Sequence, residues 1–185
     1  MNSYKGKTQQ FSVIVILYFI GNIRTEFAET NTTWPDVAIL LLSLHVNSDG
    51  GAIFRRGLNM KSSYFEHFKS LKFQDGFTLI PVLLHPYSRG KIKLRSKNPF
   101  EKPVFIANYF EDPRDILTLQ KAIDITFSLV KNTRKFQKYG AKFFNKINPA
   151  CVKFKPYSQQ YWECLSRYFT YQIYHDVGTC KVSSI

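Results

Sequence analysis

The sequence contains four histidines, the side chains best suited to acid-base catalysis because imidazole titrates near neutral pH. Three of them stand in settings that are typical of structural or exposed side chains. His45 follows an apolar run, His67 lies in a charged segment, and His85 precedes a proline in a turn. We therefore expect these three histidines to have no catalytic role.

The fourth histidine, His175, stands just before a Gly-Thr turn at Gly178 and Thr179. Glycine has no side chain to block the main chain, so the backbone at this point is able to approach a planar ligand closely. Binding and catalytic residues are often found on such loops. His175 is therefore the strongest candidate for acid-base catalysis.

The three cysteines, Cys151, Cys164 and Cys180, show neither C-x-x-C spacing nor a histidine pair at the distance of a zinc site, so we expect no metal site. Three cysteines form at most one disulfide within the chain. Cys151 and Cys164 are the nearer pair in the sequence, and three buried, reduced thiols are the alternative.

Length and composition predict one ordinary domain with a buried core. The chain has 185 residues, of which 44% are hydrophobic and 16% aromatic. This composition excludes intrinsic disorder, collagen and coiled coil. Lysine and arginine number 26 against 13 acidic residues, which gives a net charge of +13 and favours non-specific attraction to polyanions.

Residues 89–97 alternate strictly, with Ile92 and Leu94 on one side and five cations on the other, which predicts a half-buried strand. A cationic row of this kind either binds phosphates or forms the solvated face of an edge strand, where it opposes aggregation. We favour the edge strand and expect no nucleic-acid partner, because no RNP, KH or helix-turn-helix pattern accompanies the row.

Other elements are predicted from apolar runs and helix signals. Residues 37–44, 78–84 and 104–109 are typical of strands. Asp112 and Pro113 begin a helix, as cap and first helical residue. Apolar side chains follow at three- and four-residue intervals: Ile116, Leu119, Ile123, Phe127 and Val130. A shorter helix is expected over residues 158–170. Strands followed by helices, without regular alternation, indicate an α+β domain with a mostly antiparallel sheet flanked by helices.

Residues 1–33 form an N-terminal segment with two interpretations. The apolar run at residues 11–20 fits a buried strand or a secretory leader, although no pair of small residues marks a cleavage site. The run is shorter than the roughly 20 residues that cross a bilayer, so we expect no membrane span. If the chain is exported, Asn31-Thr32-Thr33 is an acceptor sequence for N-linked glycosylation.

The octapeptide YHDVGTCK at residues 174–181 resembles the catalytic-histidine segment, HPVGTCKMG, of the glucose-methanol-choline family of FAD-dependent oxidoreductases. Further segments resemble the substrate-binding and C-terminal portions of the insect glucose dehydrogenase-like branch of that family. They are WPD at 34–36, NSDGG at 47–51, the long stretch 77–103, NYFEDPRD at 108–115 and YWECLSRY at 161–168. The resemblance covers nearly the whole chain.

The resemblance implies oxidation of the CH–OH group of an alcohol or sugar, with hydride transfer to the flavin of FAD. His175 would be the general base, and Gly178 and Thr179 would let the main chain approach the isoalloxazine ring. Residues 34–185 would be one substrate-binding and C-terminal domain, truncated at its C-terminus, without the family's Rossmann-type FAD domain. Relatives on this branch are often exported, which favours a secreted protein.

The sequence also departs from the family pattern. It has no G-x-G-x-x-G loop for the FAD pyrophosphate, it lacks the family's second catalytic histidine or asparagine, and Asp176 stands where the family usually has proline. We therefore expect a fragment of a flavin oxidoreductase that by itself binds FAD poorly and oxidises no alcohol. The alternatives are a non-enzymatic truncated relative that serves as a binding or structural protein, and a polyanion-binding protein.

Overall fold

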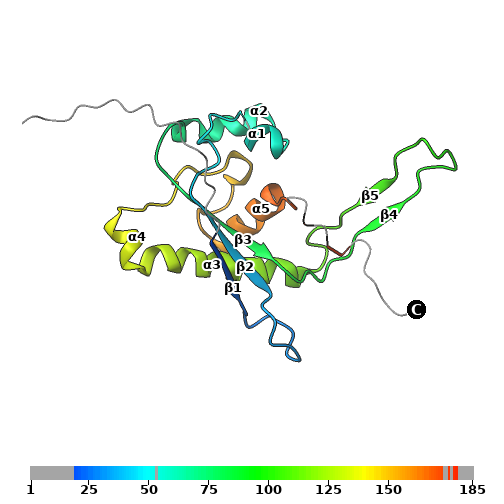
Figure 1. The fold of residues 1–185 in the computed structure, drawn as a ribbon, viewed down its shortest axis with the longest axis horizontal. Coiled ribbons are helices and arrows are strands. Elements are labelled where there is room, and N and C mark those ends of the chain that lie inside the picture. Colours follow the sequence, from blue (N-terminus) through cyan, green and yellow to red (C-terminus); the bar gives the residue numbers. More distant parts are fainter. Residues whose placement is uncertain (1–18, 53, 173–174, 176, 179–185) are drawn as a thin grey trace, which may run out of the picture.

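The computed structural model describes residues 19–52, 54–172, 175, 177 and 178. A three-stranded antiparallel sheet lies against a long helix, and a separate two-stranded sheet extends away from them (Figure 1). This arrangement confirms the predicted α+β class. The strands are β1 (Phe19–Ile23), β2 (Val37–Leu42), β3 (Thr78–Leu83), β4 (Lys91–Lys93) and β5 (Val104–Ile106). The helices are α1 (Phe54–Gly57), α2 (Ser62–Phe65), α3 (Pro113–Asn132), α4 (Arg134–Lys138) and α5 (Gln159–Phe169), with short 3-10 helices at Glu66–Leu71 and Pro149–Cys151.

The middle strand of the larger sheet, β2, carries the best buried part of the core. Its sequence, VAILLL, is apolar throughout, and it pairs antiparallel with both β1 and β3. Val37 is completely buried and Ile39 is 6% exposed, and both belong to one cluster with Ala122 of α3. Burial of a side chain of this size contributes about 1.5–3 kcal/mol. The strands predicted at residues 37–44 and 78–84 are therefore confirmed.

The edge strand β1 differs from the buried strand predicted over residues 11–20. Residues 11–18 lie outside the described residues. Phe19 and Ile20, where β1 begins, are 64% and 61% exposed, so the predicted burial is wrong at these two positions. The reason is that the core cluster reaches β1 only at its other end, where Ile23 packs against it.

A loop of residues 24–36 connects β1 to β2 and is fastened at its base by Asp36. The Asp36 carboxylate accepts hydrogen bonds from the main-chain N–H of Thr25 (2.8 Å) and from its hydroxyl (2.5 Å), and both residues are buried. The base of the loop is therefore tied to the sheet. The predicted start of the substrate-binding domain at residue 34 falls within this loop and stays a prediction.

Helix α3 begins where the sequence predicts it. The Asp112 side chain accepts the main-chain N–H of Arg114 (2.9 Å), and Pro113 is the first helical residue. The predicted apolar stripe faces the core, since its buried members include Ile116, Leu119 and Val130. None of the described helices combines the length and the apolar character that crossing a membrane requires.

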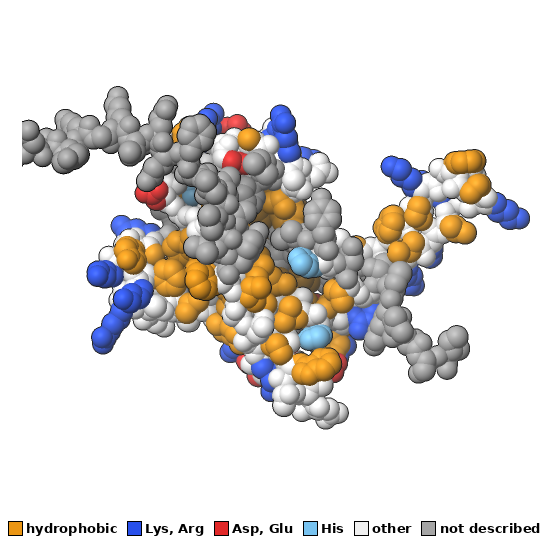
Figure 2. All heavy atoms as spheres, viewed as in Figure 1, with side chains coloured by type: hydrophobic (Ala, Val, Ile, Leu, Met, Phe, Trp, Pro, Cys, Tyr) orange, Lys and Arg blue, Asp and Glu red, His pale blue; other side chains and the backbone are white. Residues whose placement is uncertain are grey.

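The strand predicted over residues 89–97 is shorter and more exposed than expected. β4 covers Lys91–Lys93 and pairs with β5 in a two-stranded sheet. Ile92 is 44% exposed and Leu94 is 85% exposed, so the prediction of a half-buried strand is wrong. Two strands form a single layer, and in the described chain its apolar side is left largely uncovered. Figures 1 and 2 show this hairpin as an arm that carries hydrophobic and cationic side chains away from the body.

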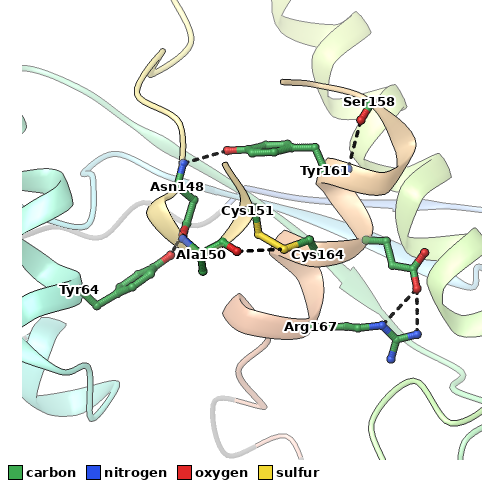
Figure 3. Close-up of a disulfide and its surroundings, with 9 residues drawn as sticks. Tyr64, Asn148, Ala150, Cys151, Ser158, Tyr161, Cys164 and Arg167 are labelled. Carbon is green, nitrogen blue, oxygen red and sulfur yellow. Dashed lines mark hydrogen bonds and ion pairs between the residues drawn. A yellow bond between two sulfur atoms is a disulfide. The ribbon is translucent and has the colours of Figure 1, made fainter. Parts of the chain in front are cut away.

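Cys151 and Cys164 form a disulfide that joins the 3-10 helix at Pro149–Cys151 to α5 (Figure 3). The two cysteines are 13 residues apart in the sequence, and their Cα atoms are 5.9 Å apart. Closing a loop of this length contributes about 3 kcal/mol in the chain-entropy account. The nearer cysteine pair is thus the bonded one, and the alternative of three reduced thiols is wrong.

Asn148 links this disulfide region to two tyrosines (Figure 3). Its main-chain N–H donates to the hydroxyl of Tyr161 on α5 (3.3 Å), and its side-chain amide donates to the hydroxyl of Tyr64 on α2. Asn148 is 2% exposed, and burial raises the pKa of Tyr64. One buried residue therefore connects α2, α5 and the 3-10 helix at Pro149–Cys151 through its main chain and its side chain.

His67 lies in a cluster of aromatic rings that joins the 3-10 helix at Glu66–Leu71 to a later loop. Its ring centroid is 4.9 Å from that of Phe68 and 5.4 Å from that of Phe144, both in edge-to-face geometry. Burial lowers the pKa of His67, and the nearby charge of Lys146 lowers it further. The neutral imidazole is therefore the form that fits this cluster, and His67 is a structural residue.

This pKa shift predicts a pH-dependent stability that depends on His67. The folded chain holds the pKa of His67 below its ordinary value of about 6.5, so between the two values the unfolded chain binds more protons. The contribution of His67 to the free energy of unfolding should therefore be at its full value above about pH 6.5 and should fall as the pH drops below it. Urea denaturation on either side of that pH measures the fall, which should be smaller in His67→Gln. His175→Gln, at an exposed position, is the control, and equal pH dependence in His67→Gln and the unsubstituted chain would contradict the prediction.

Candidate active site

The buried carboxylate of Asp115 fastens the 85–90 segment to the first turn of α3. Asp115 is 1% exposed, and its two oxygens accept the main-chain N–H groups of Tyr87 (2.7 Å) and Ser88 (2.9 Å). Hydrogen bonds to a charged group are stronger than neutral ones, and each contributes about 1.5–3 kcal/mol. The position of the 85–90 segment is therefore set by the start of α3.

A second set of contacts closes over the same junction from the solvent side. The main-chain N–H of Asp112 donates to the hydroxyl of Ser88 (3.0 Å). The Arg114 guanidinium donates to both carboxylate oxygens of Asp112 (2.9 and 2.6 Å) and lies 3.6 Å from the ring centroid of Tyr87. These hydrogen bonds from Arg114 lower the pKa of Asp112 to about 2. The carboxylate that caps α3 therefore stays ionised through ordinary acidic conditions.

The 85–90 segment in turn holds Gly178, which follows the candidate catalytic histidine. The main-chain N–H of Gly90 donates to the carbonyl oxygen of Gly178 (3.2 Å). Gly178 has a φ of +86°, and a Cβ atom at this position would lie 3.2 Å from the carbonyl oxygen of Ser88. Glycine is therefore required here by the backbone conformation and by the close approach of the 85–90 segment.

A cavity of about 660 Å³ opens beside this contact. Its walls come from the 24–36 loop, the 85–90 segment, the β4–β5 hairpin and the chain after His175. The residues that line it include Phe27, Trp34, His85, Arg89, Phe105 and Gly178. A cavity with mostly apolar walls and a few polar groups is typical of sites for small organic molecules.

The polar and aromatic groups of the cavity are held in place by neighbours. The rings of Trp34 and His85 are stacked with their centroids 6.2 Å apart, and Trp34 is 67% exposed. The Arg89 guanidinium donates to the carbonyl oxygens of Ser88 (3.0 Å) and Pro86. The cavity therefore offers a bound molecule an aromatic surface and a positioned cation.

Of the three site residues predicted from the sequence, the structure places one, Gly178, on a wall of this cavity. Gly178 lines it, together with Val177. His175 is exposed, is not among the lining residues, and its main-chain N–H donates to the carbonyl oxygen of Gln172 (3.0 Å). Thr179 lies outside the described residues. The structure thus brings Gly178 to the cavity and leaves His175 three residues away along the chain.

The buried histidine of the described chain, His45, has a structural role. His45 is 6% exposed, and its Nδ1 accepts the main-chain N–H of Asn47 (3.2 Å). Its Nε2 therefore carries the proton and donates to the carbonyl oxygen of Gln74 (2.8 Å). Within the described residues, no group of three or more His, Cys, Asp or Glu side chains is placed to hold a metal ion.

Two residues that shape the site, Asp115 and Trp34, lie in segments that resemble the family, but the sequence assigns neither of them a role. Asp115 has the local signature of a first-turn acid that complements the helix dipole, and its partners are 27 and 28 residues away. Trp34 stands next to a proline, just before a predicted strand. For Asp115, the unusual feature that marks its role is complete burial of an acid, which appears only in the folded chain.

A family model described as GMC oxidoreductase matches residues 86–184, just over half of the chain. The chain belongs to the GMC oxidoreductase family. It is similar to a glucose dehydrogenase (FAD, quinone) of Drosophila pseudoobscura pseudoobscura, at 36% identity over 104 residues, which is 56% of this chain and 16% of the relative. An ecdysone oxidase of Bombyx mori is 30% identical over 109 residues, 58% of this chain and 16% of the relative. An alcohol dehydrogenase (acceptor) of Pseudomonas putida is 32% identical over 117 residues, 63% of this chain and 20% of the relative.

This GMC chain therefore spans about a fifth or less of the length of these relatives. The matched residues include the 85–90 segment from Pro86 onward, the β4–β5 hairpin, α3, α5 and the chain around His175. The elements joined by Asp115 and by Gly178 thus lie within the GMC match, and Trp34, on the 24–36 loop, lies outside it.

The Asp115 junction predicts that Asp115→Asn destabilises the chain strongly. An asparagine oxygen accepts one of the two N–H groups, and its amide then turns two hydrogens toward the other, which is left without an acceptor. We expect the free energy of unfolding to fall by about 2 kcal/mol or more, with faster amide hydrogen exchange at Tyr87 and Ser88. The control is Asp124→Asn, at an exposed position on the same helix, which should change the stability by less than about 0.5 kcal/mol. Equal stabilities for the two variants would contradict this account.

Proposed function

We propose that residues 34–185 are the substrate-binding and catalytic-histidine portion of an FAD-dependent oxidoreductase that acts on CH–OH groups of alcohols or sugars. The GMC family membership and the names of the matched relatives support this reaction class. The observation that carries the proposal is the contact between Gly90 and Gly178, which holds the chain after His175 at the wall of the cavity.

In the proposed reaction Trp34 and His175 have roles that match their chemistry. The alcohol or sugar lies against the aromatic surface of Trp34, where its C–H groups contact the ring. His175 takes the hydroxyl proton at an imidazole nitrogen and passes it to solvent, to which its exposed side chain has access. When bound, FAD supplies the hydride acceptor.

The described residues fit one edge of a flavin site. Gly178 has no side chain, has a positive φ and lies on the cavity wall, so a flat ring is able to approach the main chain there. Gly178 and Thr179 would hold this edge of the isoalloxazine. The sequence has no G-x-G-x-x-G loop to hold the pyrophosphate, so these residues account for a small part of the contacts that FAD needs.

The role of His175 is tested in a chimera with an active relative. The GMC-matched residues 86–184 replace the corresponding part of the Drosophila pseudoobscura glucose dehydrogenase, and oxidation of glucose is followed with a quinone dye. We expect His175→Ala to lower kcat by about 10²–10⁴-fold without loss of bound flavin, because it removes the general base. Tyr168→Phe, at an exposed position on α5, is the matched control and should leave kcat unchanged. A chimera whose kcat is the same with and without the imidazole of His175 would refute the assignment.

The 185-residue chain by itself is expected to bind FAD weakly and to oxidise no alcohol. The physical reason is that the pyrophosphate, which carries the charge of the cofactor, has no glycine-rich loop to receive it in this sequence. Flavin fluorescence during titration of the purified chain measures binding, and dye reduction measures turnover. Stoichiometric flavin with alcohol-dependent dye reduction would show that the expectation is wrong.

A further inference from the structure

We propose that Asn31 carries an N-linked glycan, a modification that does not depend on the proposed oxidoreductase function. Asn31-Thr32-Thr33 is the one N-x-S/T sequence among the 185 residues, and its middle residue is not proline. Such three-residue matches are also found in unmodified proteins, so the structural setting has to decide. Exposure, the local hydrogen bonds and the redox state of the cysteines each favour modification.

Asn31 is exposed on the 24–36 loop between β1 and β2. Figure 1 shows this loop as a projection beyond the ends of the two strands, at the lower edge of the molecule. A bulky, hydrated glycan is accommodated at a projecting loop without displacing core side chains. The position of Asn31 therefore meets the steric requirement for modification.

The loop keeps its shape without help from the Asn31 amide nitrogen. The Arg24 guanidinium donates to the carbonyl oxygens of Glu29 and Thr32 (3.1 Å each), and the main-chain N–H of Thr32 donates to the carbonyl oxygen of Glu29 (3.3 Å). The Asn31 Oδ1 accepts the hydroxyl of Thr30 at 3.4 Å, and its Nδ2 makes no hydrogen bond with any described residue. The atom to which the sugar attaches is thus available, and its modification breaks no contact that holds the loop.

The Cys151–Cys164 disulfide indicates the compartment in which such a modification occurs. Disulfides form and persist in the secretory pathway and outside the cell, and are rare in reducing compartments. N-linked glycans are added in that same pathway. We therefore place the chain in the secretory pathway, where its disulfide forms and its acceptor sequence receives a glycan.

The proposed transfer takes its sugar from a lipid-diphosphate-linked oligosaccharide. The bond between C1 of the first sugar and the diphosphate oxygen breaks, a bond between C1 and Nδ2 of Asn31 forms, and one amide proton leaves to a base. The diphosphate departs with the lipid and keeps the bonding electrons. Glu29 and Thr32, on either side of Asn31, line the cavity described above, so the glycan is attached on one of the loops that form the cavity wall.

The test directs the 185-residue chain into the secretory pathway of insect cells with a cleavable leader placed before its own N-terminus. We expect the secreted chain to migrate one discrete step more slowly than the deglycosylated chain, and peptide-N-glycosidase to remove the shift. Peptide mass spectrometry after that digestion should show aspartate at position 31. Labelling of free thiols confirms that the disulfide has formed.

Matched variants locate the glycan within the acceptor sequence. Asn31→Gln and Thr33→Ala should abolish the mobility shift, whereas Thr32→Ala, at the position that tolerates any residue except proline, should retain it. A secreted, disulfide-bonded chain that carries no glycan overturns the proposal. A glycan that persists in Asn31→Gln overturns it too, because the sugar would then be attached elsewhere.

Discussion

The structure depends on a buried carboxylate whose partners are main-chain amides. An ionised Asp115 removed from water costs several kcal/mol unless its oxygens are hydrogen-bonded, and the N–H groups of Tyr87 and Ser88 supply those bonds. Since two donors must meet two oxygens at once, the 85–90 segment has one position relative to α3. Two turns further along α3, Ala122 is completely buried against β2, so the same helix also contacts the central sheet. One helix therefore sets the position of both the central sheet and the site segment.

The 85–90 segment places two further groups at the cavity. Gly90, at its end, holds Gly178, and Arg89 supplies the cation of the cavity. The β4–β5 hairpin leaves the same segment, and its base is anchored by the Asn108 amide, which donates to the carbonyl oxygen of Arg89 (2.9 Å). Beyond this base, the described residues provide no comparable anchor. Exposed Leu94 shows how little of the hairpin is covered. Support by buried contacts is therefore strong at the base of the hairpin and weak along its length.

The parts of this fold that the sequence predicted are those decided by local chemistry. The Asp112 and Pro113 signals place the start of α3, and unbroken apolar runs place β2 and β3, because capping and strand burial act over a few residues. The exposure of Ile92 was not predictable, because alternation indicates a strand and not what covers it. The sequence did not decide the cysteine pairing for a similar reason. The spacing of Cys151 and Cys164 permits a disulfide, and the packing of the 3-10 helix against α5 brings the two cysteines together. The role of Asp115 depends on partners 27 and 28 residues away, beyond any local pattern.

The contacts at the candidate site differ in strength. The Asp115 junction forms a frame with strong contacts, whereas the cavity wall at Gly178 is held weakly enough for a ligand to move it. The Asp115 junction consists of two charge-assisted hydrogen bonds in a buried setting. The described tether between Gly90 and Gly178 is one neutral main-chain hydrogen bond of 3.2 Å, which is worth about 1 kcal/mol. A substrate or cofactor that contacts the chain around His175 in even a modest way therefore competes with this tether, while the junction stays intact. The wall that includes Gly178 is thus held at the cavity by the frame, and the final position of the chain around His175 depends on what binds there.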